Sequence, residues 1–189
     1  MNLTLFSRQP KVFIDATVLC GALITDKINR QIIRLARTNL FYTPVLSKVC
    51  LLEFIRHAAS GFKGGNPYSN YEIEVFLEYF INPVLEDNPA VKSVVGRYDF
   101  RAIMKEHLPI GQVLSELSGC SDDQAREIIK QQEMQEPLKK FDTNDLHVWV
   151  TAVQTNCDLI LTSNSKRFPE RIGKIKRIHP EDFYNSISD

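Results

Sequence analysis

The sequence predicts an α/β protein built around a central parallel sheet. Short β-branched runs alternate with segments of helical periodicity, and polar residues follow directly after two of the runs. Strands that alternate with helices form parallel sheets with right-handed crossovers. The chain has 189 residues, of which 43% are hydrophobic, so we expect residues 1–189 to form a single domain around one core.

The first third of the chain carries the clearest pattern. Lys-Val-Phe-Ile-Asp at 11–15 predicts a buried strand that ends in a carboxylate. Helices are expected at 16–24 and 28–37, and a second strand at 40–46. Ser47 is well placed to cap a helix that runs to about residue 60.

The middle of the chain, about 65–138, is expected to be a helical insertion into this frame. An amphipathic helix is predicted at 68–80, with its aromatic side chains in the core and not on a base-stacking surface. A turn-rich break is predicted at 82–89. The frame then resumes with a helix at 144–155, strands at 158–162 and 174–178, and a short helix at 180–187.

Net charge argues against a protein that binds nucleic acid through bulk attraction, because 23 basic side chains are balanced by 23 acidic ones. The charges are uneven, however: 166–177 is rich in bases and 64–91 in acids. Each stretch could simply be a solvated charged face. Alternatively, the basic stretch forms a substrate rim with Lys166, Arg167 and Arg171, and the acidic stretch belongs to an insert elsewhere.

The cysteines are widely spaced, and most lie in apolar runs, so we expect small buried thiols, a reduced environment and a cytoplasmic protein. No signal-peptide pattern and no apolar run long enough for a membrane span is found in the sequence, so no membrane partner is expected.

In parallel sheets a ligand site lies beyond the carboxyl ends of the strands, which singles out Asp15 and the Ser163-Asn164 pair. Each acidic candidate also has a plain structural interpretation. Asp15 could cap a helix, Glu53 could be a solvated side chain, and Asp142 and Asp145 could form a capping arrangement. What would unite them is metal-assisted phosphodiester hydrolysis, because clustered carboxylates need a cation such as Mg²⁺ or Mn²⁺.

Four segments resemble the motifs of the PIN-domain ribonucleases. They are Val12-Phe-Ile-Asp15-Ala-Thr17-Val-Leu19, Ser47-Lys-Val-Cys-Leu-Leu-Glu53-Phe, Asp142-Thr-Asn-Asp145-Leu-His147-Val148, and a last segment that runs from Asp158 through Thr162-Ser163-Asn164 to Phe168-Pro169. They occur in the family's order, within 11–60 and 140–185.

The resemblance implies a three-layer α/β/α PIN-like fold and a Mg²⁺- or Mn²⁺-dependent endoribonuclease acting on single-stranded RNA. It also implies a toxin of the VapC type with an antitoxin partner. A homodimer is a further implication, because dimers are common among the resembling proteins. The implied residues are Asp15, Glu53 and Asp145 as catalytic metal ligands, Asn164 as a catalytic residue, Thr17 and Ser163 as supporting residues, and Asp142 as an additional acid. His147 is expected to pack or support and not to act as a base.

One departure is Arg167, which stands where the resembling branch often has an aspartate. The alternative function is therefore a PIN-like module that binds RNA or a protein without cutting. An aspartyl-phosphate phosphatase would need an acid two residues after Asp15, and Thr17 occupies that place. No glycine-rich phosphate loop and no serine-hydrolase elbow occurs in the sequence.

Overall fold

The computed structural model describes residues 8–62, 65–87, 145–165 and 168–188. Within them a five-stranded sheet has the order β2-β1-β3-β5-β4. The strands are β1 (Lys11–Ile14), β2 (Thr43–Val45), β3 (Leu159–Leu161), β4 (Arg171–Ile172) and β5 (Ile175–Ile178). Asp142, Lys166, Arg167 and the helices expected within 88–138 lie outside the described residues.

The sheet is mostly parallel, as the sequence predicts. Strand β1 pairs in parallel with β2 on one side and with β3 on the other, and β3 pairs in parallel with β5. Only β4 is antiparallel, in a hairpin with β5. Gly173 occupies this turn at φ 54°, a backbone conformation that suits glycine.

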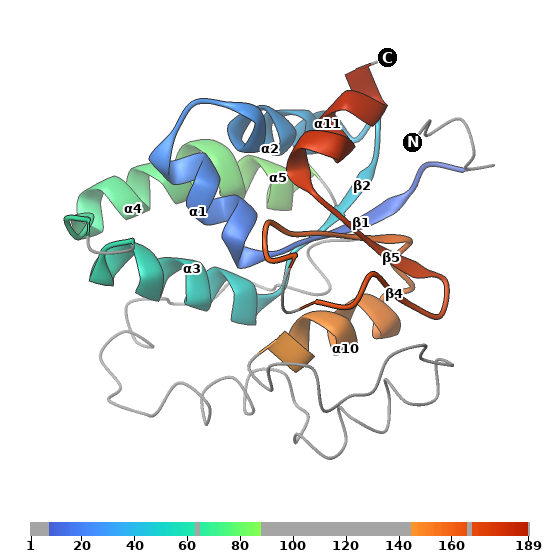
Figure 1. Cartoon of the computed structure of the whole chain (residues 1–189). Helices are drawn as coiled ribbons and strands as arrows, with labels where there is room; N and C mark the ends of the chain where they lie inside the picture. Colours follow the sequence, from blue (N-terminus) through green and yellow to red (C-terminus); the bar gives the residue numbers. More distant parts are fainter. Residues whose placement is uncertain (1–7, 63–64, 88–144, 166–167, 189) are drawn as a thin grey trace.

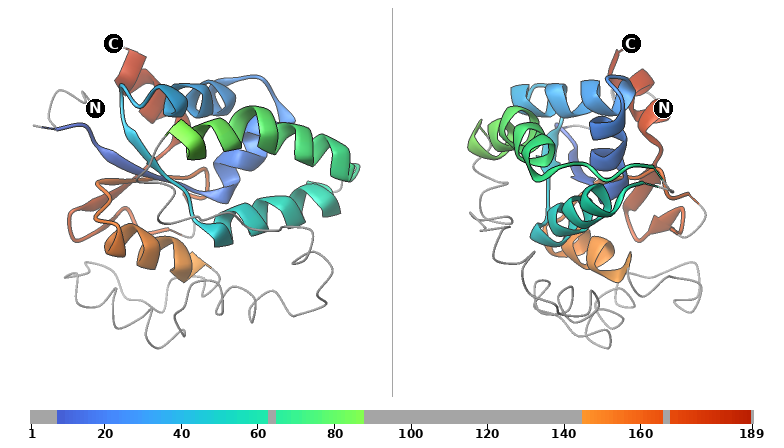
Figure 2. Two further views of the ribbon diagram at one scale, coloured as in Figure 1. Left: turned by 180° about the vertical axis from the view of Figure 1, so that it is seen from behind. Right: turned by 90° about the vertical axis from the view of Figure 1, so that its left-hand side faces the viewer.

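Helices cover both faces of the sheet (Figures 1 and 2). Helices α1 (Ala16–Ile24), α2 (Ile28–Thr38) and α11 (Pro180–Ser188) lie over one face, and α10 (Leu146–Gln154) lies over the other. Helix α3 (Lys48–Ser60) packs against α1 beyond the end at which β1 finishes (Figure 1). The arrangement is compatible with a three-layer α/β/α architecture.

The break predicted at 82–89 is wrong over its described part. Helix α4 (Asn70–Phe76) continues through a π-helical turn (Leu77–Ile81) into α5 (Asn82–Asp87). A proline inside a regular α-helix collides with the carbonyl group four residues earlier, and the wider π-turn directly before Pro83 relieves that collision.

The expectation that the aromatic side chains of 68–80 lie in the core is wrong for two of them. Phe76 is buried and packs against Phe54, whereas Tyr71 is 74% exposed and Tyr79 is 68% exposed. The helix is amphipathic as predicted, and two of its aromatic side chains lie on the solvent face instead of the core face.

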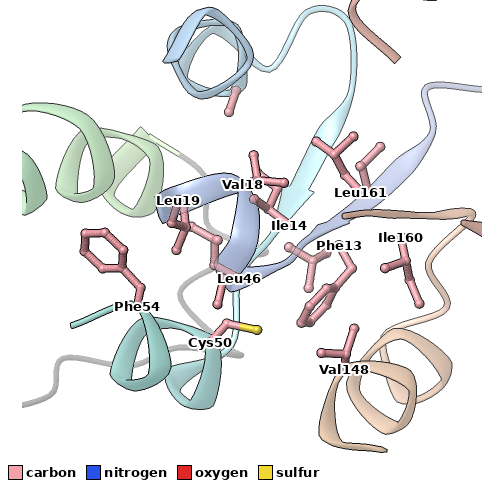
Figure 3. Packing of buried hydrophobic residues seen from close by; sticks show 14 of the residues in the cluster. Phe13, Ile14, Val18, Leu19, Leu46, Cys50, Phe54, Val148, Ile160 and Leu161 are labelled. Atoms are coloured by element: carbon pink, nitrogen blue, oxygen red, sulfur yellow. The ribbon is translucent and has the colours of Figure 1, made fainter. Parts of the chain in front are cut away.

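The core lies on both faces of β1, whose Val12, Phe13 and Ile14 have no exposed surface. Figure 3 shows Phe13 on the side of Val148 from α10, and Leu19 of α1 on the side of Phe54 from α3. A strand buried on both faces reads as a continuous apolar run, which is why this element was predictable from its sequence.

The chain order places a topological switch point at β1. From β1 the chain first adds β2 on one side, and it later adds β3 on the other. The carboxyl ends of β1 and β3 are adjacent, because the backbone N–H of Asp15 donates to the carbonyl oxygen of Leu161 at 3.1 Å. Ligands of open α/β sheets bind in the crevice at such a point.

Candidate functional site

Asp15 is the buried acidic residue at the switch point. It takes the N-cap position of α1, as the capping interpretation expects, but its side chain makes no capping hydrogen bond. The residue is only 4% exposed. A buried carboxylate that does not serve the neighbouring helix must be held by other groups.

Two threonine hydroxyls hold Asp15 in place. Thr17 Oγ1 donates to Asp15 Oδ2 at 2.6 Å, and Thr162 Oγ1 donates to the same oxygen at 2.7 Å. The same hydroxyls accept from the next loop: Ser163 N donates to Thr17 Oγ1 at 3.1 Å, and Asn164 N donates to Thr162 Oγ1 at 3.0 Å. The network ties the end of β1 to the chain that leaves β3.

This environment disfavours the charge on Asp15. Burial raises the pKa of Asp15, the two threonine hydroxyls partly oppose that change, and the nearby charge of Glu53 raises the pKa further. No basic side chain of the described residues forms an ion pair with Asp15. The site therefore holds a buried acid that a cation would stabilise.

Glu53 extends from α3 between two histidines. That helix begins after Ser47, whose Oγ accepts from the backbone N–H of Cys50 at 3.1 Å. Glu53 Oε1 lies 3.7 Å from His57 Nε2, and Oε2 lies 3.6 Å from His147 Nε2. These are ion-pair distances just beyond hydrogen-bond range.

The two imidazoles determine the charge of Glu53. Its side chain is only 22% exposed, so the interpretation as an ordinary solvated glutamate is wrong. Burial alone would raise the pKa of Glu53, but His147 and His57 outweigh burial and lower it to about 2. In return, Glu53 raises the pKa of His57. Glu53 is therefore an anion at neutral pH.

Asp145 precedes α10 and faces the loop after β3. Asn164 Nδ2 donates to Asp145 Oδ2 at 3.4 Å. Asp145 is the N-cap residue of α10, yet its side chain makes no capping hydrogen bond. Because Asn164 also donates its backbone N–H to Thr162, it connects Asp145 with the network around Asp15.

The predicted site residues thus lie on converging elements but do not all share one cluster of ligand atoms. Among the described residues, the potential metal ligands that meet within 4.8 Å of one another belong to Cys50, Glu53 and His147. This buried group could hold a metal ion. Asp15 and Asp145 are not in it.

Some functional features were not visible in the sequence. Cys50 was interpreted as a small buried hydrophobe, and Thr162 only as the end of a strand. The i, i+3 spacing of Cys50 and Glu53 on one helix was the available signal for the first. Arg171 is the one member of the expected substrate rim that lies within the described residues, and it is exposed on β4. The expected supporting residue Ser163 is also exposed.

Comparisons with protein-family models, curated proteins and solved structures gave no match to this chain. In the part of the chain that the structure describes, no helix has both the length and the apolar character that crossing a membrane requires.

Proposed function

We propose that the protein is a metal-dependent endoribonuclease that hydrolyses phosphodiester bonds of single-stranded RNA. The observation that carries the proposal is the buried Asp15 carboxylate at the switch point of the sheet, which forms no ion pair among the described residues and has only the more distant charge of His147 to oppose its burial besides the two threonine hydroxyls. Burying a carboxylate is costly unless a cation or strong hydrogen bonds compensate. Such a cost is typical of a functional site.

The chemical types of the donors at this end of the sheet suit a hard divalent cation. Asp15, Glu53 and Asp145 supply carboxylate oxygens, the ligands that Mg²⁺ and Mn²⁺ prefer. Hydrogen bonds orient two of these carboxylates: Thr17 and Thr162 hold Asp15, and Asn164 holds Asp145. When bound, the cation would activate a water and offset negative charge on the scissile phosphate.

The substrate class follows from the resemblance together with this geometry. The four segments that resemble PIN-domain ribonucleases supply Asp15, Glu53, Asp145 and Asn164, and their elements meet at one end of the sheet. The amide of Asn164 and the exposed loop residue Ser163 are suitable donors for a phosphate backbone. A toxin role with an antitoxin, a homodimer and a cytoplasmic location belong to the same proposal.

The test compares a labelled single-stranded RNA with the same RNA in a duplex, with Mn²⁺, with Mg²⁺ and with a chelator. We expect cleavage of the single strand that depends on the metal and is lost in Asp15→Asn. The matched control is Asp182→Asn, which changes an exposed aspartate of α11. Cleavage that persists in Asp15→Asn or in the chelator would refute the proposal.

The second candidate is a PIN-like module that binds RNA or a protein without cutting. It is favoured by the position of Asp15 and Asp145 outside the group of ligand atoms that meet within 4.8 Å. This candidate predicts retention of single-stranded RNA in a binding assay, with intact RNA after incubation with Mn²⁺. Metal-dependent cleavage would exclude it.

A further inference from the structure

Cys50, Glu53 and His147 bring three different donor atoms together at the boundary between α3 and α10. Cys50 and Glu53 lie three residues apart on α3, and His147 lies on α10. Their ligand atoms all lie within 4.8 Å of one another. Figure 3 shows the Cys50 sulfur directed away from its own helix and into the core.

His147 supplies an independent sign that the group lacks a ligand. The residue is only 6% exposed, and neither of its ring nitrogens has a hydrogen-bond partner among the described residues. Buried polar atoms are normally paired, so an imidazole without a hydrogen bond calls for an explanation. Its Nε2 is directed toward Glu53 Oε2, at 3.6 Å.

The chemistry of the three donors favours a thiophilic cation. Thiolate, imidazole and carboxylate are the ligand types of zinc sites, whereas Mg²⁺ prefers oxygen alone. Zinc bonds of about 2.0–2.3 Å in a tetrahedron place neighbouring ligand atoms roughly 3.3–3.8 Å apart. The Glu53–His147 pair already has such a separation, so only the remaining distances need to shorten.

We propose that Cys50, Glu53 and His147 form a site for Zn²⁺ or a similar thiophilic cation, and that this site shares Glu53 with the proposed Mg²⁺ or Mn²⁺ site. Three protein ligands leave a fourth position for water or a further group. One carboxylate held by zinc is withdrawn from the harder cation. Zinc therefore inhibits the metal-dependent activity. This inhibition rests on the proposed function, whereas zinc binding itself is independent of it.

The binding test uses Co²⁺ as a spectroscopic substitute for zinc in the full-length chain. We expect one equivalent to give a cobalt–thiolate charge-transfer band, which Zn²⁺ then removes. Cys50→Ser abolishes the band, and His147→Gln weakens Zn²⁺ binding by at least about tenfold in calorimetry. The matched control is Cys157→Ser, a second buried thiol outside the group, which leaves the band unchanged.

The wild-type spectrum decides the proposal even if a variant does not fold. Absence of the thiolate band overturns the zinc site, and so does a band that survives in folded Cys50→Ser. The sharing of Glu53 is tested by following bound Mn²⁺ by electron paramagnetic resonance during zinc addition. Release of Mn²⁺ supports it, and simultaneous binding of both ions overturns it. Both readouts are independent of RNA cleavage, so failure of the nuclease proposal is recognised separately.

Discussion

Replacing Thr162 with valine tests the network that holds Asp15. Thr162 has no exposed surface, and valine has nearly the same shape, so the change removes a hydroxyl without opening a large cavity. The lost hydroxyl donates to Asp15 Oδ2 at 2.7 Å and accepts from Asn164 N at 3.0 Å. Both ends of the network therefore lose one partner.

The expected loss of stability follows from these two bonds. A hydrogen bond to a charged group contributes about 1.5–3 kcal/mol, and an ordinary one about 0.5–1.5 kcal/mol. Where Asp15 is ionised, we expect Thr162→Val to lower the free energy of unfolding by about 2–4.5 kcal/mol, which adds the two contributions. Thr151→Val is the control, because Thr151 Oγ1 donates only to the carbonyl oxygen of His147 within α10, and its removal costs less than about 1 kcal/mol.

The pH dependence carries a definite sign. Because the folded protein raises the pKa of Asp15, this group destabilises the fold as pH rises through the raised pKa. The Thr162 hydroxyl opposes that rise in pKa, so its removal raises the pKa of Asp15 further and makes the total loss of stability larger. The stability difference between the wild type and Thr162→Val should therefore be larger above the pKa of Asp15 than below it.

The assay is denaturant unfolding followed by tryptophan fluorescence at successive values from about pH 4 to about pH 8. A difference below about 0.5 kcal/mol at every pH, or one equal to that of Thr151→Val, would refute the reasoning. In that case the bonds to Asp15 would contribute no more than an internal helix bond.

Two further predictions concern charge and packing. Glu53→Gln should lower the free energy of unfolding above pH 4.5, and this effect should disappear as pH falls through about 2, the lowered pKa of Glu53. The part of the stabilisation that comes from His57 should be lost as pH rises from 6.5 through the raised pKa of that histidine. Denaturant unfolding of both proteins at successive pH values measures the two effects. Phe183→Ala should cost about 3–5 kcal/mol of unfolding free energy, because the fully buried ring packs edge-on against Tyr42 and anchors α11, whereas Phe41→Ala, at a ring that is 42% exposed, should cost less than about 1 kcal/mol.

Local patterns were sufficient to predict the frame. The strand at β1 follows from an apolar run that is buried on both faces, and the helix from Ala16 to Ile24 follows from a second apolar run. Ser47 caps α3 as expected. The carboxyl-end rule correctly placed Asp15 and Asn164 near one another, because it depends only on the order of the strands.

Tertiary contacts account for what the sequence could not supply. The sequence places Cys50 and Glu53 on one face of α3, but the meeting of Cys50 with His147 depends on how α3 and α10 pack. The strand β4 has only two residues, so its sequence shows no alternation of apolar and polar residues that would predict a strand. Its pairing with β5 depends on the turn at Gly173. Tyr71 and Tyr79 are exposed because of the way this helical segment packs against the rest of the molecule, which no local pattern determines.

The two outer strands have a consequence for assembly. An edge strand invites a neighbouring chain to extend the sheet by backbone hydrogen bonding, unless it is short, twisted or interrupted by proline. Here β2 has three residues and contains Pro44, which has no N–H to donate, and β4 has only two residues. Within the described residues, neither margin offers a row of free backbone groups. The margins of the described sheet are therefore poor places for a second copy of this chain to extend it, so contacts between described parts of two copies would use side chains of helices and loops.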